Sequence, residues 1–210
     1  MTRAEPPTVF IVDDDAAVRD SLALLLDLKG WRTRGFASAE SFLAALESSW
    51  SGCVVADLRM PGMDGAALQA ELARRAPGLP VIVVTAHGDI TAARATLKAG
   101  AVDFIEKPID DAQLFDAVAA ALERGHEWRE DASREAERAE RLARLTERER
   151  EVLDRVVAGK HNREVAAELG ISPRTVEVYK SRMMEKLQVR RIPDLIRLVL
   201  GSKPGDDRRP

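Results

Sequence analysis

The sequence has few of the residues that build disulfide, metal or membrane sites. Its one cysteine, Cys53, cannot form an intrachain disulfide, and its place at the start of an apolar run indicates a buried thiol. The three histidines show no metal-ligand spacing. No apolar run approaches the roughly 20 residues that a membrane-spanning helix needs, and the N-terminus lacks the basic and apolar regions of a signal peptide. We therefore expect a globular protein of the cytoplasm.

The charged residues are distributed unevenly and divide the chain into three parts. Residues 1–122 carry 11 Lys and Arg against 17 Asp and Glu, residues 123–145 carry 6 against 7, and residues 146–210 carry 15 against 11. An acidic part suits a metal cation, whereas a basic part suits a polyanion such as nucleic acid. The length of 210 residues fits two domains, one of about 100–150 residues and one of about 60.

The acidic part alternates short apolar runs with segments of helical periodicity. The runs TVFIV, CVVAD, VIVVT and VDFIE lie at 8–12, 53–57, 81–85 and 102–106, with a weaker one at 32–36. Strands that are apolar on both faces and separated by helices form a parallel sheet covered on both sides. Residues 5–122 are therefore predicted to form an α/β doubly wound domain with a five-stranded parallel sheet.

Residues 123–145 have neither a strand pattern nor a proline, and many Glu/Arg pairs lie three or four residues apart. Such pairs favour a solvated helix, so we predict a charged helical linker. A thin stripe of alanine and leucine from Ala132 to Leu145 leaves a second interpretation open, in which this helix is a dimer seam.

Residues 146–202 show only helical patterns and are predicted to form an all-α domain. Thr146 and Glu149 match a T-x-x-E capping box, which begins a helix. Gly170 ends a helix, and Ser172 followed by Pro173 begins the next one. Helix, short turn and helix in this order form a helix-turn-helix unit.

Polar side chains stand at the carboxyl ends of the predicted strands, where doubly wound sheets bind ligands. Asp13 and Asp14 end the first strand, Asp57 ends the third, Thr85 ends the fourth, and Lys107 follows the fifth. Carboxylates provide the oxygen ligands of Mg²⁺, and the ion and the lysine together offset the charge of a phosphoryl group. The sequence thus predicts a site for Mg²⁺ and a phosphoryl group.

Each aspartate taken alone has a simpler explanation, because an aspartate after a strand commonly caps a helix or forms a turn. The motifs VDDD, DLRMPGMDG, VTA and EKP, in this order and at these strand ends, make that explanation inadequate for the set. The DDD triplet also contains the D-x-D of haloacid-dehalogenase-like phosphatases. That family places Thr or Val at the fifth position, where this chain has Ala17, and gives no role to Asp57.

With these motifs, residues 8–122 resemble the receiver domain of two-component response regulators, which has a flavodoxin-like fold. The resemblance implies that Asp57 is the phosphoacceptor. It also implies that Asp13 and Asp14, with Asp57 and the main-chain carbonyl of Arg59, arrange the Mg²⁺.

The same resemblance assigns the residues around the phosphoryl group. Lys107 would pair with it, Thr85 would direct its hydroxyl to it, and Phe104 would be the aromatic switch at a position often filled by Tyr. The peptide bond from Lys107 to Pro108 is expected to be cis. Arg59 and His87 occupy positions that tune hydrolysis of the acyl phosphate in this family.

The helix that begins at Pro173 is predicted to have two different faces. At 100° per residue, one face gathers the residues expected to be buried: Val176, Tyr179, Met183, Met184 and Leu187. The other carries Arg174, Glu177, Val178, Ser181, Arg182 and Glu185. Such a face can enter the major groove of DNA. Val178 either contacts a thymine methyl there or is an ordinary exposed valine.

Residues 145–189 (LTEREREVLDRVVAGKHNREVAAELGISPRTVEVYKSRMMEKLQV) resemble the LuxR-type helix-turn-helix, and the whole chain resembles the NarL/FixJ family, especially its FixJ branch. The resemblance places base contacts at Glu177, Val178 and Ser181. The other residues predicted to bind DNA are Arg174, Thr175, Lys180 and Arg182. Tyr179 departs from the usual His, and Gln188 departs from a usual Gly that would give an easy left-handed cap. The helix from about Pro193 to Leu200 would be the family's dimer contact.

The sequence therefore predicts a transcription factor, and not an enzyme, that a sensor histidine kinase activates by phosphoryl transfer to Asp57. The added charge would draw in Thr85 and Lys107 and turn Phe104 inward. The expected partners are the kinase, promoter DNA, a second copy of the chain upon phosphorylation, and RNA polymerase, with no membrane. Two other classes stay open: a constitutive DNA-binding protein with an unused receiver, and an Mg²⁺-dependent aspartyl-phosphate phosphatase.

Overall fold

The computed structural model describes residues 7–76, 78–86, 96–98 and 100–201. The chain forms two compact units, Met1–Glu130 and Asp131–Pro210. His87 lies outside the described residues.

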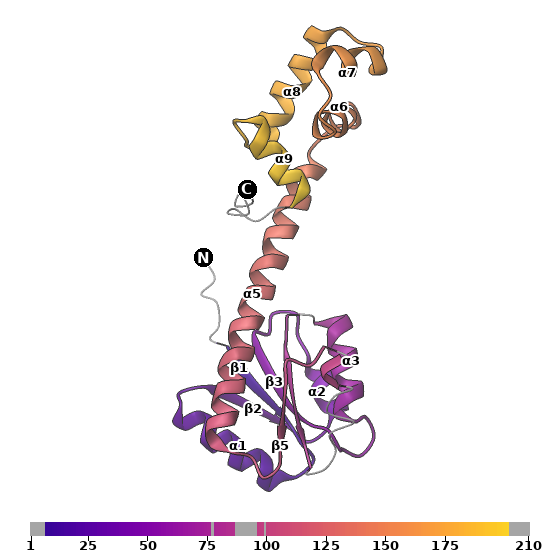
Figure 1. Ribbon diagram of the computed structural model, residues 1–210. Helices are drawn as coiled ribbons and strands as arrows, with labels where there is room; N and C mark the ends of the chain where they lie inside the picture. Colours follow the sequence, from indigo (N-terminus) through magenta and orange to yellow (C-terminus); the bar gives the residue numbers. More distant parts are fainter. Residues whose placement is uncertain (1–6, 77, 87–95, 99, 202–210) are drawn as a thin grey trace. The chain divides into compact units, whose positions relative to one another are not determined.

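The first unit is built on a parallel sheet whose strands follow the order β2-β1-β3-β4-β5 (Figure 1). Its elements are β1 (Thr8–Val12), α1 (Ala16–Leu28), β2 (Arg32–Phe36), α2 (Ala39–Ala45), β3 (Gly52–Asp57), α3 (Gly65–Arg75), β4 (Val81–Thr85), β5 (Asp103–Glu106) and the first part of α5 (Asp111–Ala143). The predicted doubly wound five-stranded sheet is confirmed.

Two apolar cores lie on the two faces of this sheet. One joins the sheet to α2 and α3 through residues such as Phe42 and Leu68. The other joins it to α1 and α5 through residues such as Leu26 and Val118. Every residue of the central strand β3 is buried, as expected for a strand covered on both faces, and burial raises the pKa of the Cys53 thiol to about 12.

Helix α5 covers residues 123–143 of the predicted helical segment 123–145 and ends two residues before that segment does. Gly125 is buried, and a Cβ atom there would lie 3.0 Å from Pro80 Cδ and 3.1 Å from the carbonyl oxygen of Gly52. These contacts would be tighter than most that real Cβ atoms make, so a glycine favours the close approach of the helix to the sheet. Further along, Arg141 and Arg144 form ion pairs with glutamates four residues earlier, as the charge spacing predicts.

The second unit packs four helices around one apolar core. These are α6 (Glu147–Val157), α7 (Asn162–Leu169), α8 (Pro173–Leu187) and α9 (Ile192–Leu200). The Thr146–Glu149 capping box, the Ser172 cap and the left-handed Gly170 are all present. The predicted helix-turn-helix, α7 and α8, is confirmed. None of the helices in the described ranges has the length and apolar character to span a membrane.

Helix α8 ends at an unusual residue. Gln188 adopts the left-handed conformation, with φ 57° and ψ 38°, and its N–H donates to the carbonyls of Glu185 and Met184. A side chain in this conformation costs roughly 1–2 kcal/mol, a cost that glycine does not have. The helix therefore ends in a left-handed geometry that glycine usually provides, at a residue that is not glycine.

We expect Gln188→Gly to stabilise the second unit by about 0.5–1 kcal/mol, because relief of strain exceeds the added entropy of the unfolded chain. Glu185→Gly is the control, since a glycine inside α8 should cost about 1 kcal/mol. Calorimetry of the full chain, with hydrogen exchange of the amides in α6 and α8, measures both changes. A loss of stability in Gln188→Gly would contradict this interpretation.

Candidate functional site

Lys107 connects two of the predicted aspartates. Its Nζ lies 2.5 Å from Asp57 Oδ1 and 3.3 Å from Asp13 Oδ2. Asp13 and Asp57 are only 3% and 7% exposed, whereas about a third of the Lys107 side chain is exposed. Two carboxylates with so little access to water are stable only near a cation, and Lys107 provides one.

The sheet explains why these groups meet. Val12 and Ala56 are partners in the β1–β3 register, so Asp13 and Asp57 follow at the same level on neighbouring strands. Lys107 follows β5, and its N–H donates to the Thr85 carbonyl at the end of β4. Parallel strands place their carboxyl ends along one edge, which brings residues far apart in sequence into one pocket.

The second oxygen of each aspartate is held by the backbone. Asp13 Oδ1 accepts from the N–H of Asp15 at 2.8 Å, and Asp57 Oδ2 accepts from the N–H of Arg59 at 2.7 Å. Each carboxylate is thus fixed in orientation, with its other oxygen directed at Lys107.

Burial and charge act on the pocket in opposite directions. Burial raises the pKa of Asp13, and the Asp15 N–H and Lys107 only partly offset this. Burial would lower the pKa of Lys107, but its hydrogen bond to Asp57 and the charges of both aspartates raise it overall. Lys107 therefore stays an ammonium group at neutral pH.

The other two residues of the aspartate triplet differ in role. Asp15 caps α1 by accepting from the N–H of Ala17, which is the simple explanation for an aspartate after a strand. Asp14 is exposed. Among the described residues, no three His, Cys, Asp or Glu side chains gather closely enough to hold a metal ion.

Mg²⁺ nevertheless fits the donor set. This ion commonly takes one or two carboxylates and keeps several waters, so it does not require a preformed cluster of three. Asp13 and Asp57 are buried oxygen donors of the preferred kind, and the Arg59 carbonyl belongs to the same turn. The part taken by Asp14 stays a prediction.

Thr85 and Phe104 lie on one face of the sheet. Phe104 pairs with Val83 in the β4–β5 register, and strand alternation gives Val83 and Thr85 the same face. Thr85 is 2% exposed and donates to the Ala86 carbonyl at 3.4 Å, while Phe104 is partly exposed. The bond from Lys107 to Pro108 is cis, as predicted.

Two residues that the sequence analysis did not assign hold the turn after Asp57. A Cβ atom on Gly65 would lie 2.4 Å from the carbonyl oxygen of Asp57, so α3 begins directly against the backbone of Asp57. Glu40 Oε1, on α2, accepts from the N–H of Met63 at 2.8 Å. Gly65 belongs to the motif DLRMPGMDG and could have been noticed, whereas nothing in the sequence relates Glu40 to this turn.

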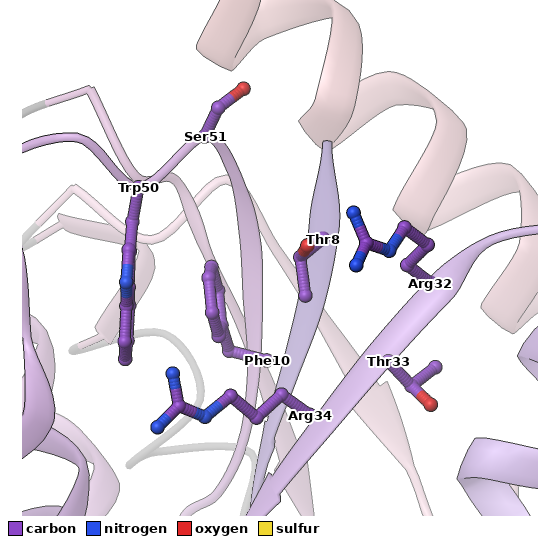
Figure 2. A pocket seen from close by; sticks show the side chains of 7 residues that line it. All are labelled: Thr8, Phe10, Arg32, Thr33, Arg34, Trp50 and Ser51. Carbon is purple, nitrogen blue, oxygen red and sulfur yellow. The ribbon is translucent and has the colours of Figure 1, made fainter. Parts of the chain in front are cut away.

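A pocket of about 210 Å³ lies near the opposite ends of β1 and β2 (Figure 2). The ring of Trp50 stacks on Phe10 at 4.4 Å between centroids, and the guanidinium of Arg34 lies 4.8 Å from the Trp50 centroid. Phe10 and Arg34 thus both pack against the indole, on the same side of the ring (Figure 2). Arg32 and Arg34 stand on an edge strand, where charged side chains discourage pairing with other chains. We assign this pocket a structural role.

In the second unit, α8 presents the two predicted faces. Val176, Met183 and Leu187 are fully buried, whereas Val178 is 43% exposed. Arg174, Glu177, Ser181 and Arg182 are also exposed. Two of the predicted DNA-binding residues are instead half-buried and engaged: the Thr175 hydroxyl lies 2.8 Å from that of Ser172, and Lys180 donates to Asn162.

An ion pair that the sequence analysis did not identify holds α8 to the start of α6. Lys186 Nζ lies 2.7 Å from Glu149 Oε2, which also accepts from the N–H of Thr146 at 2.8 Å. Glu149 is 3% exposed. Burial alone would raise the pKa of this carboxyl, but the hydrogen bonds from Lys186 and Thr146 outweigh it and lower the pKa.

This geometry defines a class: a doubly wound domain with an Asp–Lys–Asp pocket at its strand ends, together with a helix-turn-helix domain. Comparison with protein-family models agrees. Residues 9–119 match the response regulator receiver domain, and residues 143–199 match the luxR family of bacterial regulatory proteins. The chain belongs to the response regulators that combine these two domains, a family of transcription regulators.

Similar proteins match along nearly the whole chain. The transcriptional regulatory protein FixJ of Azorhizobium caulinodans is 45% identical over 96% of this chain and 97% of its own length. FixJ of Rhizobium meliloti is 44% identical, over 94% and 97%. Among solved structures, the response regulator StyR aligns with a TM-score of 0.81 at 39% identity, covering 93% of this chain and 99% of its own. Full-length FixJ from B. japonicum aligns with a TM-score of 0.58 at 39% identity, covering 92% and 96%.

The Glu149–Lys186 pair predicts a pH-dependent stability. Because the folded-state pKa of Glu149 is lowered, its contribution is present above the ordinary glutamate pKa and is lost as pH falls through the folded-state value. We expect Glu149→Gln to cost the second unit about 1.5–3 kcal/mol from neutral pH down to about pH 4, and progressively less as the pH falls from about 4 to about 2.

Calorimetry of the full chain over this pH range measures the difference between wild type and variant. Glu151→Gln is the control, because Glu151 pairs with Arg148 at the surface and should cost less than about 1 kcal/mol. A Glu149→Gln deficit that is the same at every pH would show that the carboxylate charge is not responsible.

Proposed function

We propose that this response regulator receives a phosphoryl group on Asp57 from the phosphohistidine of a sensor histidine kinase and thereby changes its binding to promoter DNA. The observation that carries the proposal is the Lys107 ammonium between Asp57 and Asp13 at the strand ends. This contact supports the proposal, because the Asp57 carboxylate, which we propose as the nucleophile, lies beside a cation that can offset phosphoryl charge.

The transfer needs little from the chain beyond positioning and charge. An oxygen of Asp57 attacks the phosphorus, the phosphorus–nitrogen bond breaks, and the kinase histidine leaves with its electron pair and takes up a proton. Lys107 exchanges its contact with the carboxylate for one with a phosphoryl oxygen. Mg²⁺ held by Asp13, Asp57 and the Arg59 carbonyl, with Asp14 beside it, would supply further positive charge.

The switch follows from the new charge of about −2 at Asp57. The Thr85 hydroxyl, whose contact with Ala86 is long at 3.4 Å, turns to a phosphoryl oxygen. That movement vacates space on the face that Thr85 shares with Phe104, and the aromatic ring turns inward. Phe104 has no hydroxyl, so its change of position acts through packing alone.

A groove beside Lys107 suits the kinase. A pocket of about 430 Å³ runs along α1, lined by Val18, Leu22 and Leu25 together with Pro108 and Ile109 after β5. Leu24 and Leu28, on the same helix, are 65% and 75% exposed. An apolar surface next to the phosphoacceptor fits a partner helix that brings its phosphohistidine to Asp57.

In the second unit the exposed face of α8 would enter the major groove of promoter DNA. The residues that we assign to this contact are Arg174, Thr175, Glu177, Val178, Lys180, Ser181 and Arg182. The dimer formed upon phosphorylation would use α9, where Leu200 is 64% exposed. RNA polymerase is a further proposed partner, and the cytoplasm is the proposed compartment.

Asp57→Asn should abolish acyl-phosphate formation from acetyl phosphate and Mg²⁺, because an amide cannot act as the nucleophile. Intact-mass measurement counts the phosphoryl groups. Asp27→Asn, which changes an exposed aspartate on α1, is the matched control and should be labelled like the wild type. Undiminished labelling of Asp57→Asn would refute the assignment, and a label found on Asp13 would favour the phosphatase mechanism.

A further inference from the structure

A side chain of α7 contacts two residues of the recognition helix at once. Asn162, the first residue of α7, accepts from Lys180 Nζ at 3.0 Å and donates to Glu177 Oε1 at 3.5 Å. Lysine can only donate and a carboxylate can only accept, so the amide oxygen must face Lys180 and the amide nitrogen must face Glu177. The orientation of the Asn162 amide is therefore determined by its partners.

Glu177 and Lys180 lie three residues apart on one helix, a spacing at which opposite charges usually form an ion pair. In the described part of the chain, where both residues lie, no direct ion pair joins them, and the Asn162 amide contacts each instead. A glutamate paired with a neighbouring lysine would lose acceptor capacity towards DNA. The amide keeps the carboxylate and the ammonium group separate.

We infer that Asn162 is a positioning residue for DNA recognition. It holds the Glu177 carboxylate free to accept from the N4 amino group of a cytosine, and it holds Lys180 towards a backbone phosphate. This inference rests on the proposed binding of DNA by the outer face of α8, and it adds a residue outside that helix to the determinants of sequence preference.

The test uses the phosphorylated full-length protein and a pool of random-sequence DNA duplexes. Wild-type selection defines the preferred duplex, and each variant is then measured on single-base changes of it at several salt concentrations. Asn162→Ala should reduce discrimination roughly tenfold at the base pair that Glu177→Ala identifies, and it should lower the salt slope by about one, as Lys180→Ala does. In a Glu177→Ala background, Asn162→Ala should change no base preference further.

Two further variants separate positioning from folding. Asn162→Asp repels Glu177 and places a carboxylate on Lys180, so it should lose base discrimination and lower the salt slope at least as much as Asn162→Ala does. Arg163→Ala, at the exposed neighbouring position, should leave base discrimination unchanged. Hydrogen exchange of α7 shows whether each variant keeps the helix.

The outcomes distinguish the two levels of the proposal. If Glu177→Ala changes base preference and Asn162→Ala does not, the inference about Asn162 is wrong while DNA recognition by α8 stands. If Asn162→Ala weakens binding to all duplexes equally, with faster exchange in α7, Asn162 has only a structural role. If Glu177→Ala alters no base preference, the assignment of the α8 face fails, and the role of Asn162 fails with it.

Discussion

The contact of Lys107 with Asp13 and Asp57 is the constraint on which the first unit depends. Two buried carboxylates at neighbouring strand ends repel each other and lose hydration, so they require a cation. The fold supplies it from the end of β5, two strands away from Asp57. Such a site is suited to accept a phosphoryl group. Lys107 can exchange its contact with the Asp57 carboxylate for one with a phosphoryl oxygen, so the cation that the new charge needs is already in place.

The second unit also contains a buried carboxylate that needs a cation beside it. Its buried charge, Glu149, is neutralised by Lys186 and by the backbone of the capping box, so a buried ion pair joins α6 and α8. At the surface, the Asn162 amide contacts both Glu177 and Lys180, and we propose that it keeps these two charges from neutralising each other.

Local sequence patterns predicted the strands, the helices and the pocket, because a few neighbouring residues are enough to identify an apolar run, a helix cap or a strand end. Contacts between segments that are distant in the sequence could not be predicted in this way. The close approach of Gly125 to the sheet, the support of the turn by Glu40, and the pairing of Lys186 with Glu149 have no local pattern. Gln188 shows a third case: the sequence indicated a missing cap, and the chain adopts the left-handed conformation despite the cost.

We propose that phosphorylation of the first unit changes DNA binding by the second. Genome-wide mapping of the DNA bound by the protein, with and without phosphorylation, tests this coupling most directly. The account predicts that a defined set of promoters gains occupancy upon phosphorylation and that these promoters share one sequence. Identical occupancy in the two states would contradict it, and would leave a DNA-binding protein whose receiver does not switch.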